Sequence, residues 1–197
     1  MLSQDALALI PTLSSHLSLP EEDAIFRPLL PQDVEPLGLF FLSLSESTRR
    51  RYWPHALDEK GARVVCSELD SRRALRMVAF SRASEAIIVA YFIIEFELPA
   101  TERSRYLNYG IQLSEESDCR LAPVVADARQ NTGVGSVLMQ RTLETTRQLD
   151  RRRVILYGGV QAANHRAIHF YEKFGFKRVG TFHKHNRDNI DMLLNLR

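Results

Sequence analysis

The sequence predicts one mixed α/β domain of the α+β class, with a central β-sheet flanked by helices. Two strand-like stretches, 75–82 and 86–98, follow each other across a short turn that contains Ser and Glu. The second is almost continuously apolar, which is typical of a strand covered on both faces. Strand-like and helix-like segments then alternate from 121 to 174, an order that indicates a mixed sheet. The length of 197 residues fits a single compact domain.

The first third of the chain is expected to supply an N-terminal extension, one strand and two helices. Residues 1–22 are mildly apolar and end at Pro20 and an acidic cluster, so we expect an arm or short helix before a domain that spans 23–197. Gln32 and Asp33 can begin a helix because the apolar residues after them recur at helical spacing. The expected elements are a strand at 24–29, a helix that starts at 32 and ends around 43–48, and a helix at 59–69.

The remaining elements follow from apolar runs and from the turn residues between them. Residues 106–113 are expected to form a strand or an insertion, and 121–126 a strand that contains a proline. A glycine-bearing loop then leads to a helix at about 134–149. The expected order is completed by a strand at 153–160, a helix at 164–174 and closing strands at 176–182 and 190–196.

Composition argues against several classes of protein. The formal net charge of +2 is too small to indicate a nucleic-acid-binding protein. No apolar run is long enough to span a bilayer, and the N-terminus lacks the basic start of a signal peptide, so we expect no membrane partner and a cytoplasmic protein. Cys66 and Cys119 lie among apolar residues, as buried thiols do. His183 and His185 lack the spacing of a zinc motif, so we expect no metal site.

Residues 130–135, Gln-Asn-Thr-Gly-Val-Gly, link a hydrophobic strand to an amphipathic helix. Two glycines let the backbone turn tightly and approach a ligand closely. The first amides of the helix have no intrahelical acceptor and carry the positive end of its dipole, which suits a phosphate or pyrophosphate. A dinucleotide fingerprint needs a third glycine where Leu138 stands, and a P-loop needs lysine after Gly135, where Ser136 stands. Taken alone, the loop fits an ordinary tight connection as well as it fits a phosphate site.

The strand before this loop, residues 121–125, contains Pro123. Proline in a strand implies an edge or a bulge, because it removes a hydrogen bond from the ladder. A strand that splays from its neighbour at this point leaves backbone groups unpaired, and these can bond an amide-containing ligand arm. Pantetheine has two such amides. We therefore expect the loop to hold a pyrophosphate while the strand pairs with the pantetheine arm.

A second informative stretch runs from Asn164 to Phe176. Asn164 is a good N-cap, and Gly175 stands where a left-handed residue ends a helix. Between them, four residues at helical spacing form one face: Ala167, Phe170, Tyr171 and Phe174. Tyr171 differs from the other three because its hydroxyl needs a hydrogen-bond partner when it is buried.

With these two stretches in hand, the chain resembles the GNAT (Gcn5-related N-acetyltransferase) superfamily. The Q/R-x-x-G-x-G/A motif of that superfamily matches residues 130–135, and its Asn-x-x-Ala-x-x-Phe-Tyr-x-x-x-Gly-Phe pattern matches 164–176. The resemblance is specific over about 119–182. Two further segments look like those of bacterial protein-acetyltransferase-type members: 25–29 and 40–45.

The resemblance implies a GNAT fold, with the sheet splayed after the strand before the loop, and an acetyl-CoA-dependent N-acetyltransferase. The acetyl group would pass directly to a primary amine of a small molecule or peptide in a ternary complex, without a metal. Carried over to this sequence, Val125 bonds the pantetheine arm through its backbone, and Tyr171 protonates the departing thiolate, whose thiol has an ordinary pKa of about 8.5. Simple packing of Tyr171 in the core or against the cofactor stays open. The residues implied in cofactor binding are Val124, Val125, Gln130, Asn131, Thr132, Gly133, Val134, Gly135, Ser136 and Asn164.

The acceptor half of the site does not follow the same pattern. Many family members carry a glutamate near the start of the strand before the loop, which acts as general base, but that place falls here at Cys119 or Arg120. Asp118 and His55 are the acceptor-side candidates, and the ordinary pKa of histidine near 6.5 would suit a base. A bound water, or an amine that arrives partly neutral, stays open.

Residues 49–55, Arg-Arg-Arg-Tyr-Trp-Pro-His, lie between the first two expected helices, which in the family wall the acceptor site. Clustered arginines beside aromatic residues can select an acidic or phosphorylated acceptor. They can equally form a solvated helix end with Trp53 in the core. The missing glutamate also motivates an alternative function, a catalytically weak GNAT-fold module that binds or senses acyl-CoA. The identity of the acceptor and the existence of a homodimer stay open.

Overall fold

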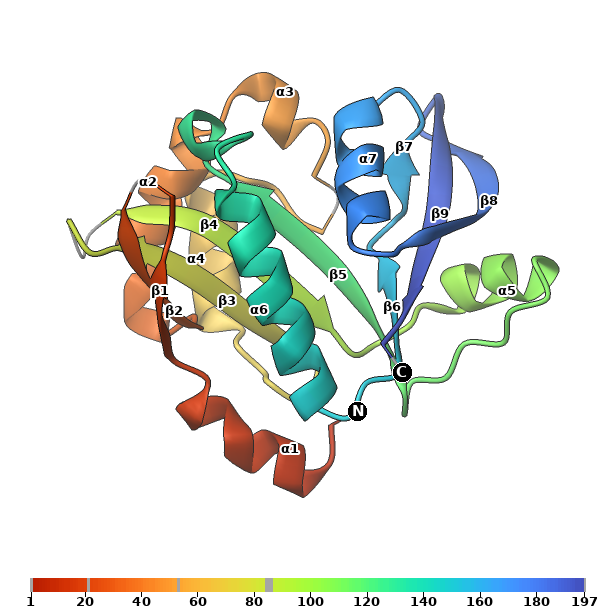
Figure 1. Cartoon of the computed structure of the whole chain (residues 1–197), viewed down its shortest axis with the longest axis horizontal. Coiled ribbons are helices and arrows are strands. Elements are labelled where there is room, and N and C mark those ends of the chain that lie inside the picture. The colour runs from red at the N-terminus through yellow and green to blue at the C-terminus, as the bar shows by residue number, and fades with distance from the viewer. Residues whose placement is uncertain (1, 21, 53, 84–86, 197) are drawn as a thin grey trace.

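The computed structural model describes residues 2–20, 22–52, 54–83 and 87–196, and these ranges form a mixed α/β structure around one sheet (Figure 1). Ala86, the expected start of the second long strand, lies outside the described residues. The strand order is β1-β2-β3-β4-β5-β6-β9-β7, and β8 pairs with β9. β5 and β6 are parallel and the other pairs are antiparallel, which confirms the predicted mixed sheet. The strands are β1 Ser15–Ser18, β2 Asp23–Pro28, β3 Ala74–Ser81, β4 Ile88–Glu95, β5 Asp118–Val125, β6 Arg153–Leu156, β7 Val160–Gln161, β8 Lys177–Lys184 and β9 Arg187–Asn195.

Helices cover both faces of the sheet (Figure 1). One face carries α1 Gln4–Leu9, α6 Val134–Gln148 and α7 His165–Lys173, and the other carries α2 Val34–Ser43, α4 Glu59–Ser67 and α5 Ala100–Asn108. Because side chains alternate along a strand, β4 feeds both cores. Phe92 belongs to the core with α6, and Tyr91 to the core with α2 and α4. The short helical turns are η1 Ile10–Thr12, η2 Pro31–Asp33, α3 Glu46–Arg49 and η3 Asp127–Arg129.

The N-terminal segment takes part in both the sheet and the core. Ser3 caps α1 by accepting a hydrogen bond from the Ala6 amide at 3.2 Å. The chain then adds β1 to the edge of β2 in antiparallel register. Pro20 lies against the glycine loop, with its Cγ 3.1 Å from the point where a Cβ on Gly133 would stand. The residues expected as an arm therefore extend the sheet and support the loop.

The segment 106–113, expected as a strand or an insertion, differs from the prediction. Its first residues complete helix α5, which begins after Pro99. A helix forms here because Glu102 and Tyr106, one turn apart, are the two residues of this helix that are buried. Their shared face packs α5 onto the sheet beside β6 and β9. The apolar residues at 106, 107, 111 and 113 do not show this spacing on their own.

The strand expected at 153–160 is also interrupted. β6 ends at Leu156, and β7 starts only at Val160. Gly158 and Gly159 have positive φ angles of 66° and 70°, a conformation that turns the chain out of the strand. The break lies beside the point where β5 loses its neighbour.

β5 and β6 separate halfway along β5. They pair from Asp118 to Leu121, and the amide of Tyr157 makes the last bond to the Leu121 carbonyl at 3.0 Å. β5 then continues to Val125 along β4 alone. Since Leu121 presents its backbone to β6, Pro123 and Val125 present theirs to the same, now open, side. The missing N–H of Pro123 therefore faces an edge where no strand needs it, and the predicted splay is confirmed.

Candidate functional site

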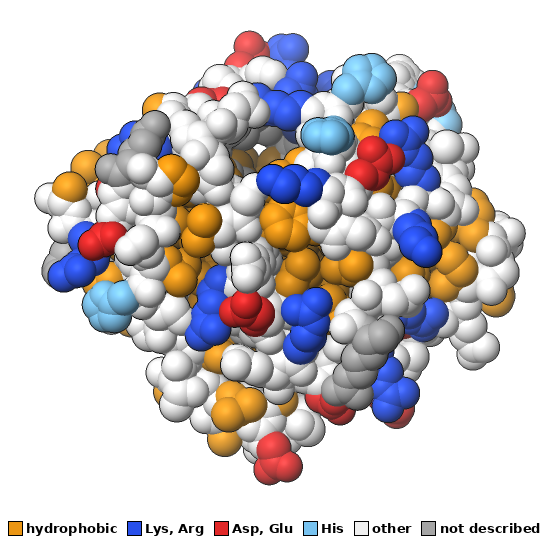
Figure 2. Space-filling view, in the orientation of Figure 1, with side chains coloured by type: hydrophobic (Ala, Val, Ile, Leu, Met, Phe, Trp, Pro, Cys, Tyr) orange, Lys and Arg blue, Asp and Glu red, His pale blue; other side chains and the backbone are white. Residues whose placement is uncertain are grey.

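A cavity of about 460 Å³ lies where β5 and β6 separate. Figure 2 shows its mouth as a hollow with apolar atoms inside and Lys or Arg side chains at the rim. The walls come from the α3–α4 segment, the open edge of β5, the glycine loop, the β6–β7 turn and α7. Most predicted site residues line it, namely Val124, Val125, Gln130, Asn131, Gly133, Gly135, Ser136, Asn164 and Tyr171.

The glycine loop has the backbone geometry that an anion site requires. Gly133 is the N-cap of α6 with φ of 98°, and Asn131 also has positive φ, at 65°. The first turn of α6 presents amides that have no acceptor within the helix, at the positive end of its dipole. The side chains of two predicted residues turn elsewhere. Thr132 donates its hydroxyl to the Arg129 carbonyl at 2.9 Å, and Val134 is fully buried in the core, so only their backbones can serve a ligand.

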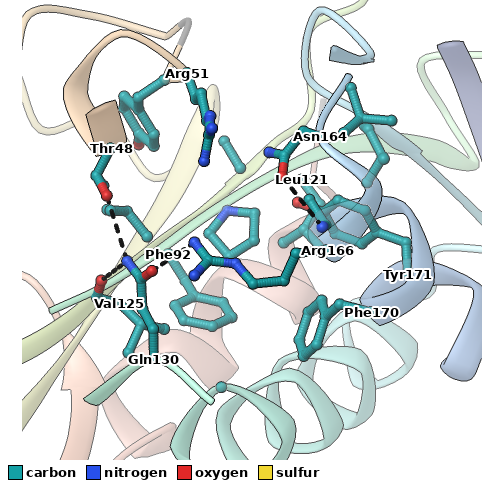
Figure 3. A pocket seen from close by; sticks show the side chains of 18 of the residues that line it. Thr48, Arg51, Phe92, Leu121, Val125, Gln130, Asn164, Arg166, Phe170 and Tyr171 are labelled. Atoms are coloured by element: carbon teal, nitrogen blue, oxygen red, sulfur yellow. Dashed lines mark hydrogen bonds between the residues drawn. The ribbon is translucent and has the colours of Figure 1, made fainter. Parts of the chain in front are cut away.

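Gln130 ties the loop to β5 and α7 (Figure 3). Its Nε2 donates to the Val125 carbonyl at 3.0 Å, and its Oε1 accepts from Nη2 of Arg166 at 2.6 Å. Arg166 thereby crosses the cavity wall from α7, and Arg51 lines the cavity from the side of α3. Two guanidinium groups near a helix N-terminus strengthen a site for a multiply charged anion. Neither predicted motif pointed to Arg166, although it lies two residues after Asn164 in the recognised stretch.

A second connection fixes the wall formed by α3. The carboxylate of Asp127 accepts hydrogen bonds from the backbone and the hydroxyl of Ser45, at 2.8 and 2.9 Å, and from the hydroxyl of Thr48 at 2.7 Å. These bonds join the segment after α2 to the connection between β5 and α6. Asp127 was not predicted, because its partners lie about eighty positions away in the sequence.

Tyr171 stands in the wall formed by α7. Asn164 caps this helix, its Oδ1 accepting from the Ala167 amide at 3.3 Å, while the residue itself lines the cavity. The ring of Tyr171 packs between Phe170 and Phe176, with centroid distances of 5.6 and 5.4 Å. Its hydroxyl makes no hydrogen bond to any residue in the described part of the chain. Burial raises the pKa of Tyr171 well above the usual value, so the hydroxyl is protonated at neutral pH and free to donate.

Tyr52 supplies a second hydroxyl to the opposite wall. Its oxygen is buried and finds no hydrogen-bond partner among the described residues. Burial raises the pKa of Tyr52, so this group too remains a donor at neutral pH. In the run 49–55, Arg51, Tyr52 and Pro54 line the cavity, and Trp53 lies outside the described residues.

The two acceptor-side candidates lie outside the cavity lining. His55 packs among Phe41, Tyr52 and Tyr91, and both of its ring nitrogens are engaged, Nδ1 with the Ala56 carbonyl at 2.9 Å and Nε2 with the Tyr91 hydroxyl at 3.2 Å. Burial lowers the pKa of His55. These contacts leave no ring nitrogen free for an acceptor.

Asp118 is placed for a structural role. Its side chain is fully buried and forms two hydrogen bonds with Arg153, at 2.8 and 2.6 Å. It also accepts from the Ser114 amide at 2.7 Å. Asp118 is thus enclosed at the far end of β5, outside the cavity lining, and its role as a base stays a prediction.

Other sequence expectations can be placed as well. Cys66 and Cys119 are free and buried, as predicted. Within the described ranges, no group of three His, Cys, Asp or Glu side chains is arranged to hold a metal ion. No helix in that part of the chain is long and apolar enough to cross a bilayer.

Comparison with known proteins identifies the site-bearing segment. Residues 118–176, which run from β5 to the end of α7, match the Acetyltransferase (GNAT) family. No curated protein matches the sequence.

Solved structures resemble more than nine tenths of the chain at low sequence identity. The GNAT domain of S. lividans PAT gives a TM-score of 0.72 at 18% identity, over 93% of this chain and 97% of that one. Ribosomal-protein-S5-alanine acetyltransferase from Vibrio fischeri gives 0.70 at 12%, over 92% and 96%. Mycobacterium smegmatis RimJ, in complex with CoA-disulfide, gives 0.68 at 14%, over 92% and 86%. The fold predicted from the resemblance is confirmed.

Proposed function

From a chain that carries the GNAT acetyltransferase segment on a GNAT fold, we propose an N-acetyltransferase that uses acetyl-CoA. The acetyl group passes directly to a primary amine of a small molecule or peptide while both substrates are bound. One observation carries the proposal: the open edge of β5, the N-terminus of α6 and the hydroxyl of Tyr171 all border the same cavity.

The residues present fit a CoA-type donor. The first turn of α6, with Gly133, Gly135 and Ser136, offers amides to the pyrophosphate, and Arg166 and Arg51 add positive charge. Gly135 leaves room for this, because a Cβ there would project into the space beside Val125 and Phe170, at 3.6 and 3.7 Å.

The pantetheine arm has a matching edge. The backbones of Pro123 and Val125 face the open side of β5, so the amides of the arm can bond there as an added strand would. Val124 and Asn164 complete the lining of this part of the cavity. In the structure the Val125 carbonyl accepts a hydrogen bond from Gln130. An amide of the pantetheine arm would bond to this carbonyl beside Gln130 or in its place.

Tyr171 is the proposed acid. Acetyl-CoA supplies a thioester, whose C–S bond breaks with the electron pair going to sulfur. The buried, protonated and otherwise unbonded hydroxyl of Tyr171 can donate its proton to that sulfur. The amide nitrogen gives up a proton in turn, which restores the phenol.

Two acceptor classes remain within the proposal. A peptide amine is supported by the likeness in fold to a ribosomal-protein-S5-alanine acetyltransferase. A small-molecule amine is equally compatible with the cavity.

A second candidate function is an acyl-CoA binding or sensing module with weak turnover. Two observations favour it. Cys119 or Arg120 stands where the family pattern expects a catalytic carboxylate, and Pro123 offers no N–H to the open edge of β5.

Two assays test the proposal. Acetyl-CoA at a hundred times its Kd should add about 2.7 kcal/mol to the free energy of unfolding and raise Tm by about 5–10 °C, whereas NAD and ATP should not. Release of free thiol is then measured against a panel of alkylamines and peptides. No Tm shift at saturating acetyl-CoA would refute both CoA-based functions, and a shift without thiol release would favour the sensing module.

A further inference from the structure

A group of charged and polar side chains, which we call the polar cluster, adjoins the cavity on the sheet face opposite α6. Its members are Arg76, Glu95, Glu102, Arg120 and Tyr157. They come from β3, β4, α5, β5 and the turn after β6, so no single sequence motif contains them.

The cluster is organised by Arg120. In the β4–β5 register Arg120 stands directly opposite Glu95. Its Nη2 donates to Glu95, its Nη1 donates to Glu102 at 3.2 Å, and its guanidinium lies 3.9 Å above the ring of Tyr157. Tyr157 is also part of the cavity lining. Glu95 is therefore linked to the cavity by two contacts: Glu95 pairs with Arg120, and Arg120 packs on Tyr157, which borders the space where a thioester would lie.

The two carboxylates of the cluster differ in how many of their oxygens already accept a hydrogen bond. Glu102 is saturated, since its Oε1 accepts from the Gly158 amide at 3.0 Å and its Oε2 accepts from Arg120. Glu95 uses only Oε2, and no described residue donates to its Oε1. Its side chain is 18% exposed, against 7% for Glu102. Glu95 does not line the cavity, so this open Oε1 would meet an incoming amine through a water.

From this geometry, and resting on the acetyltransferase function proposed above, we propose that Glu95 is the general base. It takes a proton from the acceptor's ammonium through one water. A carboxylate on β4, held by Arg120, would thus replace the one that the family pattern places on β5.

The electrostatic setting agrees with this role. Burial raises the pKa of Glu95, and the neighbouring Arg120 and Arg76 only partly offset the effect. The base form is lost as pH falls through the folded pKa. Because that pKa lies above the ordinary value of about 4.3, the acid limb of activity should also lie above it.

The protons and electrons balance. Glu95 removes one proton from R–NH₃⁺, and the freed lone pair forms the C–N bond at the thioester carbon. The C–S bond breaks, and sulfur takes the proton of Tyr171. The remaining surplus proton on nitrogen returns to Tyr171, and Glu95 releases its proton to solvent.

The test compares Glu95→Gln with Glu97→Gln in the full chain. Glu97 offers a matched control, because it pairs with Arg73 at 2.8 Å on the exposed strand end. The assay is thiol release from acetyl-CoA with the best alkylamine of the panel, from pH 6 to pH 9, with acetyl-CoA binding checked by thermal shift. At pH 7 we expect kcat/KM to fall about 100-fold for Glu95→Gln and less than about twofold for Glu97→Gln.

The pH profile separates a base from a structural carboxylate. Without a base, kcat/KM should be proportional to the fraction of unprotonated amine, which rises about tenfold per pH unit. The loss of kcat/KM in Glu95→Gln relative to the wild type should therefore shrink at least about tenfold between pH 7 and pH 9. A deficit that is equal at every pH, or no deficit beyond that of Glu97→Gln, would overturn the proposal. If Glu95→Gln does not fold, Glu95→Asp replaces it. The same criterion applies to it: a deficit of Glu95→Asp in kcat/KM that narrows as pH rises supports the base, and a deficit equal at every pH refutes it. Absence of turnover in the wild type would instead refute the proposed function itself.

Discussion

The proposed cofactor half and the proposed acceptor half of the site are built in different ways. The cofactor half comes from one continuous stretch, 118–176, and relies on backbone groups at the edge of β5 and the start of α6. The proposed acceptor half combines side chains of the α3–α4 segment, which line the cavity, with the polar cluster of β4 and α5 beside it. Its polar groups are held by ion pairs and by packing against rings, as in the contact of Arg120 with Tyr157.

The difference shows what local sequence can encode. Backbone recognition of a phosphate-bearing arm needs particular conformations, and these leave glycine, asparagine and proline at fixed spacings. Side-chain recognition of an acceptor needs only that the sheet bring distant residues together. In the acceptor half, the register of β4 against β5 places Glu95 beside Arg120. In the loop, the spacing of residues along the sequence places the functional groups.

The largest expected effect is a loss of stability, without a loss of kcat, when Asp118 at the far end of β5 is replaced. Asp118→Ala leaves Arg153 without its partner and the Ser114 amide without an acceptor, so we expect the free energy of unfolding to fall by about 3 kcal/mol. Chemical denaturation measures that loss. The kcat of the folded fraction at low temperature should stay within about twofold of the wild type. A specific loss of kcat with unchanged stability would return Asp118 to the acceptor half as a base.

Tyr171→Phe tests the chemical role of the cofactor half. Because the hydroxyl of Tyr171 bonds to no other described residue, its removal should leave stability and acetyl-CoA binding nearly unchanged. We expect kcat to fall about 100-fold, which is about 2.7 kcal/mol of transition-state stabilisation. Tyr109→Phe is the control, since that hydroxyl lies outside the cavity lining and donates to the Thr181 carbonyl and the Asp191 carboxylate. Burial raises the pKa of Tyr171, so the acid form persists as pH rises, and wild-type kcat should show no alkaline decline from this group below about pH 10. Equal kcat for Tyr171→Phe and wild type would leave Tyr171 as packing.

The same comparison explains how much could be predicted from sequence. The splay was predictable because Pro123 marks a strand edge, and α6 and α7 were predictable because Gly133 and Asn164 mark their starts. Helix α5 was missed because only two of its residues are buried, too few for a clear period.

Three-dimensional neighbours were beyond the same reasoning. Asp127 bonds Thr48 across 79 positions, and Arg120 meets Glu95 across 25. Neither pair has a signal until the strands are placed. Asp118 shows the converse case, since a carboxylate close in sequence to the expected position of the base is buried against Arg153.

Substitution of two glycines of the loop by alanine should change stability in opposite directions. The pair tests whether the cofactor half relies on backbone groups. Gly135→Ala adds a Cβ at ordinary contact distance, 3.6 Å from Val125, and alanine favours a helix, so stability should rise by about 0.5 kcal/mol. The same methyl group occupies the approach to the amides, so the Kd for acetyl-CoA should increase about tenfold.

Gly133→Ala is the matched variant. Its φ of 98° and the contact with Pro20 at 3.1 Å make any side chain strained, so stability should fall by about 1–2 kcal/mol. Thermal unfolding and calorimetric titration measure both quantities for both variants. Unchanged acetyl-CoA binding by Gly135→Ala would show that the ligand does not approach α6 at this point, and a loss of stability would show that the added Cβ is not accommodated.

The smallest expected effect concerns Arg166, whose side chain adds positive charge to the cofactor half, which otherwise relies on backbone groups. Arg166→Ala removes a cation beside the loop and its bond to Gln130, and we expect the Kd for acetyl-CoA to rise about fivefold at low salt, or about 1 kcal/mol. The difference should shrink toward twofold at about 0.5 M salt, because screening weakens exposed charge interactions. Arg63→Ala removes the same charge from exposed α4 and should leave binding unchanged. A fivefold loss that persists at high salt would mean that Arg166 acts by positioning Gln130 rather than by its charge, since the hydrogen bond is the part of its contribution that salt screens least.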